Sequence, residues 1–203
     1  MPLTASDTNK SFDPAPPGTH PAICYAVVDL GTQTGEYQGE VTVRHQVWIA
    51  WEFPELMFEM EDGPPMPKTI SIFLTLSLHD KSSMKPLLEG WRGKSFSDDE
   101  KEGFDIKNLL EKPCLINVIH DRDGKQKINA IMPPDDKAKA FKLKHNRTYF
   151  SFEDGGEIPA SVSDGIKRII MKSTEYNETG QQNDYDYHGP DEPPIHGEED
   201  IPF

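Results

Sequence analysis

The stretch Gln38–Phe53, QGEVTVRHQVWIAWEF, decides the fold class of this chain. Apolar side chains occupy its odd positions from Val41 onward, with His45 as the exception, and mostly polar side chains occupy its even positions. This alternation with a period of two is typical of a β-strand that buries one face and leaves the other in water. The sequence therefore predicts a long strand here, with Trp48 on the wet face.

Further strands are predicted on both sides of this stretch, separated by a helical region. His20–Leu30 and Lys68–His79 are the neighbouring strands. Lys112–His120 and Lys127–Met132 form a later pair that turns at Asp123-Gly124. The other predicted segments are a turn over Gly31–Gly35, a loop over Pro54–Pro67, helices over Ser82–Trp91 and from Ser97 toward Leu110, and a short helix over Val162–Met171.

Three strands, a helical insertion and two further strands are the layout of an OB-fold, a five-stranded and partly open barrel. The insertion is supported by Ser97-Asp98-Asp99-Glu100, which spells a capping box at the start of a helix. Another small β-barrel or an α+β sheet fits the same pattern. We expect a mainly β protein, an OB-fold-like barrel with the helical insertion between strands 3 and 4, followed by a short C-terminal helix.

Charge divides the chain into a body and a tail. The 203 residues carry 21 Lys and Arg against 35 Asp and Glu, a net charge of −14. Residues 173–203 hold nine acids and no Lys or Arg, so residues 1–172 retain −5 of that total. The tail has few aliphatic residues and cannot bury enough apolar surface to offset its ordering entropy. We expect a flexible segment over 1–17, one domain over 18–172 and a disordered acidic tail over 173–203.

Several classes of protein are disfavoured by the sequence. The N-terminus is polar and Pro-rich, unlike a signal peptide, and no apolar run approaches the roughly 20 residues of a membrane span. Cys24 and Cys114 are too few for a disulfide scaffold or a structural zinc site, and we expect both to be small buried side chains in a cytoplasmic protein. No nucleotide-binding loop or zinc-protease motif occurs, so the sequence predicts no catalytic residue, metal or cofactor.

Two sets of residues indicate nucleic-acid binding. Trp48 and Phe73 fall on the polar faces of their strands, where large aromatic rings can stack on unpaired bases; the alternative is that a loop or a terminal segment covers them. Lys137–Arg147 holds five basic residues and no acid, which suits contact with phosphates, although an ordinary solvated segment has the same pattern. The candidate DNA-binding residues are Arg44, Trp48, Phe73, Lys137, Lys139, Phe141, Lys142, Lys144 and Arg147.

The chain ends in the most specific motif, Glu198-Glu199-Asp200-Ile201-Pro202-Phe203. Phe203 combines an aromatic ring with the free α-carboxylate, and the acids before it suit a basic rim around an apolar pocket of a partner. This ending resembles the acidic tip of bacterial single-stranded DNA-binding proteins. The resemblance implies that Glu198, Glu199, Asp200, Ile201, Pro202 and Phe203 recruit replication, recombination and repair enzymes.

The body carries a second likeness, in segments spread along the chain. These segments are Cys24–Thr32, Trp51–Pro54, Thr75–His79, Trp91–Gly93 with Phe96, and Phe104–Leu110 leading to Cys114–His120. Through them the body resembles phage-encoded single-stranded DNA-binding proteins. This resemblance implies an OB-fold core and a role in phage DNA replication, recombination or repair within the host cytoplasm.

We therefore expect a non-enzymatic protein that binds and protects single-stranded DNA without strong sequence preference and recruits host or phage enzymes through its tip. The alternative is an adaptor that binds replication or recombination proteins through its tail and has little affinity for DNA. A third and more distant alternative is a metal-dependent nuclease, suggested faintly by Pro134–Lys137. No membrane is expected as a partner, and a homo-oligomer is left open.

Overall fold

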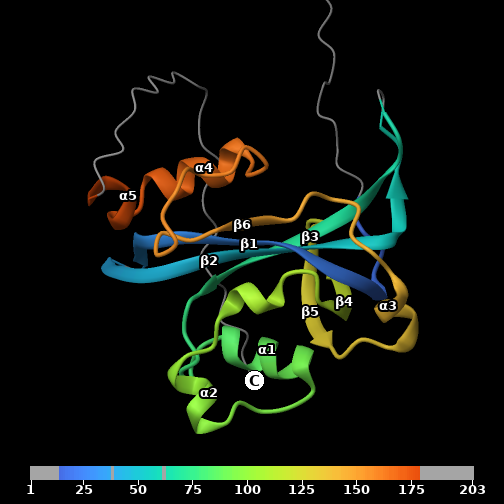
Figure 1. Ribbon diagram of the computed structural model, residues 1–203, viewed down its shortest axis with the longest axis horizontal. Coiled ribbons are helices and arrows are strands. Elements are labelled where there is room, and N and C mark those ends of the chain that lie inside the picture. The colour runs from blue at the N-terminus through green and yellow to red at the C-terminus, as the bar shows by residue number, and fades with distance from the viewer. Residues whose placement is uncertain (1–13, 38, 61–62, 179–203) are drawn as a thin grey trace, which may run out of the picture.

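The computed structural model describes residues 14–37, 39–60 and 63–178, and this part of the chain is mainly β (Figure 1). One sheet contains β1 (Gly18–Tyr37), β2 (Glu40–Phe58), β3 (Met66–Thr75), β4 (Pro113–His120), β5 (Gln126–Met132) and β6 (Thr148–Phe150). The helices are short: α1 (Met84–Arg92), α2 (Asp98–Glu102), the 3-10 helix η1 (Ile106–Leu109), α3 (Asp136–Ala140), α4 (Asp164–Met171) and α5 (Thr174–Glu178).

The sheet has the strand order β3-β2-β1-β4-β5, with antiparallel neighbours, and β6 adds a short parallel pairing with β1 at Ala26–Val28. The β1–β2 hairpin lies at the centre of the molecule (Figure 1), and its register shifts between Cys24 and Ala26 and between Asp29 and Gly31. Such bulges bend a sheet and increase its twist. The bent sheet brings its two edge strands, β3 and β5, into contact. Gln126 Nε2 of β5 donates to the Thr69 carbonyl of β3 at 2.8 Å.

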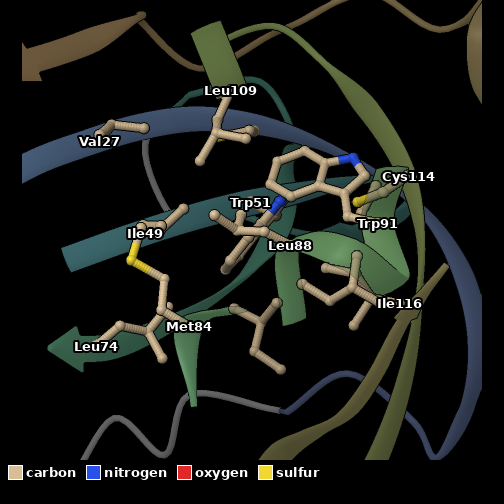
Figure 2. Close-up of a cluster of buried hydrophobic side chains, with 14 of the residues drawn as sticks. Val27, Ile49, Trp51, Leu74, Met84, Leu88, Trp91, Leu109, Cys114 and Ile116 are labelled. Carbon is tan, nitrogen blue, oxygen red and sulfur yellow. The ribbon is translucent and has the colours of Figure 1, made fainter. Parts of the chain in front are cut away.

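The main core lies between the inner face of the sheet and α1 (Figure 2). The predicted period of two is confirmed in β2, where Val47, Ile49 and Trp51 are fully buried in this core. Trp91 of α1 packs beside Trp51 with ring centroids 5.5 Å apart, and its Nε1 donates to the Pro113 carbonyl at 2.9 Å. The insertion after β3 therefore closes the inner face of the sheet.

Cys24 and Cys114 are buried free cysteines, as the sequence predicts. Both side chains belong to the main core. Burial raises the pKa of each thiol above its ordinary value. The two residues therefore act as small apolar side chains that help to fill the core.

A second and smaller core lies on the outer face of β1, beneath α4 and α5. Its buried members are Val28, Leu30, Phe150, Val162, Ile166 and Ile170. The ring of Trp48 packs against this cluster from β2. The C-terminal helices therefore cover part of the face that the sequence predicts to be exposed to water.

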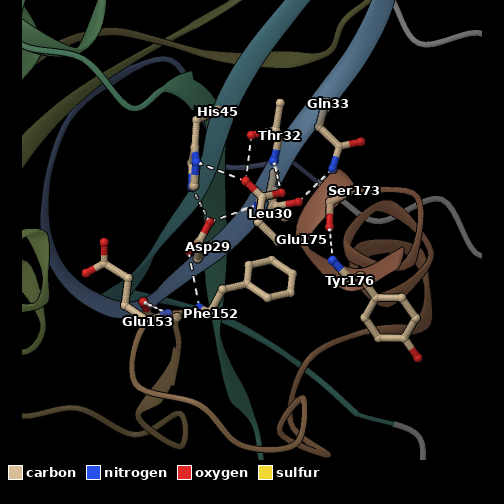
Figure 3. Close-up of polar contacts among 12 residues, drawn as sticks. Asp29, Leu30, Thr32, Gln33, His45, Phe152, Glu153, Ser173, Glu175 and Tyr176 are labelled. Atoms are coloured by element: carbon tan, nitrogen blue, oxygen red, sulfur yellow. Dashed lines mark hydrogen bonds and ion pairs between the residues drawn. The ribbon is translucent and has the colours of Figure 1, made fainter. Parts of the chain in front are cut away.

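Polar contacts fix α5 to the hairpin (Figure 3). The Glu175 carboxylate accepts hydrogen bonds from Thr32 N and Thr32 Oγ1, each at 2.6 Å. His45 Nε2 donates to Asp29 Oδ1 at 2.7 Å, and His45 Nδ1 lies 3.5 Å from Glu175 Oε1. The hydrogen bond to Asp29 raises the pKa of His45 above its ordinary value, although burial opposes that change.

Both predicted ends of the folded domain differ from the structure. Ala15 is buried, and its backbone N–H donates to Gln126 Oε1 at 2.9 Å, so the flexible segment 1–17 extends too far. Ser173 is also buried and α5 follows it, so the tail predicted to be disordered from 173 begins too early. The last basic residue, Lys172, marks where the charge of the chain changes, but the folded domain continues beyond it.

Three internal predictions also differ from the structure. The turn expected at Gly31–Gly35 is part of β1, since the hairpin continues to Tyr37. The capping box at Ser97 is confirmed, but its helix ends at Glu102 and a separate 3-10 helix follows. The sheet has six strands instead of the five predicted. The sequence does not reveal β6, because its three residues are too few to show a period of two.

We predict that Gly90→Ala destabilises the protein. A Cβ at Gly90 of α1 would lie 2.7 Å from the Ile131 carbonyl oxygen of β5, so the helix would have to move away from the sheet. Overpacking of this kind typically costs about 1–3 kcal/mol in the free energy of unfolding, which urea denaturation measures. Gly103→Ala is the matched control, because nothing lies within 4 Å of its added Cβ. Equal losses in both variants would contradict the close approach of α1 to β5.

Candidate nucleic-acid interface

Aromatic residues from three strands lie together on the outer face of the sheet. Trp48 of β2 and Phe73 of β3 are directly opposite each other in the β2–β3 register. Tyr25 of β1 contacts Trp48 edge to face, with ring centroids 6.4 Å apart. Phe73 is 44% exposed, which is unusual for a large apolar side chain. These rings present a surface suited to flat, partly apolar groups.

The two predicted aromatic residues differ in how far they are covered. Trp48 is half-buried because its ring packs against the second core, so a terminal segment does cover it in part. Phe73 is not a member of either core cluster. The prediction that the even positions of β2 face water is wrong further along the strand, where Ala50 and Glu52 are fully buried.

Glu52 is a buried carboxylate that fixes the basic segment to the sheet. Its Oε1 accepts from the backbone N–H of Lys144, and its Oε2 accepts from the backbone N–H and from Nδ1 of His145, all at 2.8 Å. Burial raises the pKa of Glu52, but the hydrogen bonds from His145 and Lys144 outweigh burial and leave the pKa below its ordinary value. The carboxylate therefore stays charged at neutral pH and holds residues 144–145 against β2.

A hollow of about 470 Å³ opens beside this anchor. The His145 ring stacks on Tyr25 with centroids 4.9 Å apart at one side of it. Burial raises the pKa of Tyr25 to about 12, so its phenol remains protonated at neutral pH. The residues that line the hollow are Tyr25, Met66, Lys144, His145, Asn146, Thr148 and Ser161. Most of these residues offer hydrogen-bonding groups, and Tyr25 and Met66 supply the apolar part of the lining.

Ion pairs within the body neutralise part of the basic segment. Lys137 pairs with Glu55 at 2.6 Å, Lys139 with Asp136 at 3.0 Å, and Arg147 with Glu111 at 3.3 Å. Lys142 and Lys144 are exposed and pair with no carboxylate among the described residues. Lys144 Nζ lies 3.8 Å from the sulfur of Met57. These two lysines are therefore the members of the segment whose charge is most available to a ligand.

The structure brings together only some of the predicted DNA-binding residues. Trp48 and Phe73 form one group, which Tyr25 and His145 link to Lys144. Arg44 lies on the same face of β2, four residues before Trp48, and is exposed. The other predicted residues lie elsewhere: Lys137, Lys139 and Phe141 on or next to α3, near the start of β1 in Figure 1, and Arg147 beside Glu111.

Sequence reasoning missed Tyr25, Glu52 and His145. Tyr25 lies at the register shift of β1, which the alternation of residues does not reveal. Glu52 had a usable signal, because a carboxylate between Trp51 and Phe53 in a buried strand requires partners. His145 lies within the basic segment, but nothing in that segment shows that its ring meets β1.

No protein-family model, curated protein or solved structure matches the chain. Within the described residues, no group of three or more His, Cys, Asp or Glu side chains is arranged to hold a metal ion. No helix in the same part of the chain is long and apolar enough to cross a membrane. The predicted partner-binding tip, residues 198–203, lies outside the described residues.

We predict that Glu52→Gln destabilises the protein near neutral pH by about 1–3 kcal/mol, because the amide cannot accept all the hydrogen bonds that Glu52 accepts. The wild-type contribution of Glu52 also depends on pH. Since its pKa is lower in the folded state, this contribution is present above the unfolded pKa and is lost as the pH falls through the folded value.

Urea denaturation at neutral pH and at about pH 4 measures both effects, since the unfolded pKa of Glu is about 4.3. We expect the difference in stability between wild type and Glu52→Gln to shrink at the lower pH. Glu59→Gln, at an exposed position just after β2, is the control and should change stability little. A difference that does not change with pH would contradict the proposed role of the charged carboxylate.

Proposed function

We propose that this protein binds single-stranded DNA on the outer face of β2 and β3, without strong sequence preference. The observation that carries the proposal is the aromatic group of Tyr25, Trp48 and exposed Phe73, with Lys144 at its border. Every base offers a flat face, so stacking on such rings contributes about 1–3 kcal/mol per base without reading its identity. Duplex DNA keeps its bases stacked inside and offers them less readily.

We further infer that the sheet is an OB-fold. The strand order β3-β2-β1-β4-β5, the helical insertion between β3 and β4, and the contact between edge strands at Gln126 and Thr69 support this assignment. The second and third strands of an OB-fold commonly bind oligonucleotides. The half-buried Trp48 and the exposed Phe73 lie on those two strands.

The charge distribution favours DNA contact at a few lysines and not along the whole basic segment. The body is acidic, and several cations of the basic segment already have carboxylate partners. Phosphates would therefore meet mainly Lys144, which borders the aromatic residues, and the exposed Lys142, two residues earlier in the chain. Binding through these phosphate contacts should weaken steeply as the salt concentration rises.

The acidic tip completes the proposal. On sequence grounds, we propose that residues 198–203 recruit replication, recombination or repair proteins during phage DNA metabolism in the host cytoplasm. The Phe203 ring would enter an apolar pocket on the partner, and the acidic residues before it would face a basic rim. Binding of DNA by the body and of enzymes by the tip would bring those enzymes to single-stranded DNA.

An adaptor with little DNA affinity is the second candidate. The observation that favours it is the partial burial of Trp48, together with the ion pairs of Lys137, Lys139 and Arg147. These features reduce the aromatic and basic surface that DNA could contact. In that case the tail would carry the function.

Tryptophan fluorescence distinguishes the two candidates. The chain has three tryptophans, and Trp51 and Trp91 are buried in the main core, so a change on DNA binding would report mainly on Trp48. We expect oligo-dT to quench the fluorescence, with a weaker effect at high salt and none from duplex DNA of equal length. No quenching at low salt, together with no complex in a gel shift, would support the adaptor instead.

We predict that Phe73→Ala weakens binding of oligo-dT by about 1–3 kcal/mol, the usual cost of losing one aromatic stacking partner. The fold should remain intact because Phe73 is exposed and outside both core clusters. Ile119→Ala is the matched control, since Ile119 of β4 is 42% exposed and lies on another strand. The stacking proposal would be wrong if the two variants bound oligo-dT equally well.

The double variant Lys142→Ala/Lys144→Ala should lower the salt dependence of binding. Each lost phosphate contact on single-stranded DNA reduces the slope of log affinity against log salt by about 0.7, so two lost contacts reduce it by about 1.4. Fluorescence titrations over a range of salt concentrations measure this slope. Lys125→Ala, in the β4–β5 turn, should leave it unchanged. An unaltered slope in the double variant would place the phosphate contacts elsewhere.

A further inference from the structure

The end of the β1–β2 hairpin extends beyond the rest of the sheet. We call residues 32–37 of β1 and 40–45 of β2 the arm. Within the arm β2 pairs with β1, whereas its pairing with β3 begins at Gln46 and continues toward Phe58. Thr32 and His45 at the base of the arm also bond to Glu175 and Leu76, and the two-stranded ribbon beyond them is only marginally stable in water on its own. The arm therefore has a physical reason to acquire another strand.

The two edges of the arm differ in what occupies them. On the β1 edge, the backbone N–H of Thr32 donates to Glu175 of α5. On β2, the side chains of Val41 and Val43 are 70% and 64% exposed, the largest values among the exposed large apolar residues of the described chain. A strand added at the β2 edge of the arm would cover part of these two side chains.

The backbone at the β2 edge is oriented to accept a strand. The carbonyl of His45 accepts from Leu76 N at 2.8 Å, so the polar groups of His45 point away from β1. Because these groups alternate in direction along a strand, Val43 and Val41 direct their N–H and C=O groups to the same edge. Such a row is a template for pairing with another β-strand.

The sequence of this edge is complementary to itself. We propose that a second copy of this chain pairs with it in antiparallel orientation, with the two-fold axis at Thr42. Glu40 of each copy then lies opposite Arg44 of the other, and Val41 lies opposite Val43. The two valine pairs form the hydrogen-bonded pairs of the ladder, and the oppositely charged pairs flank them.

Charge complementarity argues for a second copy over other occupants. Glu36 and Glu40 near the end of the arm would repel a phosphate backbone. An isologous pair satisfies each Glu40 with an Arg44, as a two-fold interface requires. Arg44 also interacts within its own chain, and its five N–H donors allow both contacts. The edge is short, so association is expected to be weak and dependent on concentration.

Charge reversal tests this pairing in the full chain. Sedimentation velocity over a range of concentrations should show dimerisation of the wild type. Glu40→Arg alone and Arg44→Glu alone each place like charges opposite each other at both ends of the ladder, and each should weaken dimerisation by about tenfold or more. The double variant Glu40→Arg/Arg44→Glu restores opposite charges and should recover it.

Mixing the two single variants gives the sharpest result. Glu40→Arg has arginine at positions 40 and 44, whereas Arg44→Glu has glutamate at both. When one chain of each variant pairs, arginine therefore lies opposite glutamate at both ends of the ladder. The mixture should therefore dimerise although neither variant does so well alone. Glu102→Arg, on exposed α2, carries the same change of charge outside the arm and should behave like wild type. Far-ultraviolet circular dichroism checks that each variant is folded.

Two results would overturn the proposal. One is a wild-type chain that stays monomeric at the highest concentration reached. The other is a dimer whose stability is the same in wild type, both single variants and their mixture, because its interface would then lie elsewhere. The inference does not depend on DNA binding, so the fluorescence titrations can fail while the sedimentation result stands.

Discussion

The buried carboxylate of Glu52 is the interaction on which the arrangement of the candidate site depends. A charge in a protein interior is costly unless hydrogen bonds compensate it, and Glu52 finds its donors in the backbone and ring of a segment far along the chain. That requirement brings residues 144–145 onto β2. The stack of His145 on Tyr25, the hollow beside it and the position of Lys144 all follow from this contact. The buried charge of Glu52 thus fixes the position of the exposed Lys144.

The β1–β2 hairpin supports two cores, one on each face, and this division limits the exposed surface. The inner face packs against α1, whereas α4 and α5 cover the outer face of β1. On β2 and β3, the outer face stays open around Phe73, which is 44% exposed. Trp48 lies at this boundary and belongs partly to the second core, so a change at Trp48 would affect stability and ligand contact together, unlike a change at Phe73.

The sequence predicts the parts of the fold that depend on local order. The alternation in β2 identifies its buried face, and the capping box at Ser97 identifies a helix start, because both reflect contacts over a few residues. The register shift at Tyr25, the partners of Glu52 and the short strand β6 depend on contacts between distant segments. Periodicity shows that one face of a strand is buried, but it does not show what lies on the other face. For that reason the sequence places Trp48 and Phe73 each on the polar face of its strand, but it shows neither that they lie opposite each other nor that their surroundings differ.

The order of the two cores along the chain has a consequence for synthesis on the ribosome. The buried residues of the main core lie between Ala15 and Ile131, whereas the second core requires Phe150 and the helix that contains Ile166 and Ile170. During synthesis the chain leaves the ribosome N-terminal end first. The main core is therefore complete in sequence while the outer face of β1 is still bare, and the C-terminal helices cover its apolar residues last. In the nascent chain, Val28 and Leu30 form a transient apolar surface that a chaperone could bind before α4 arrives.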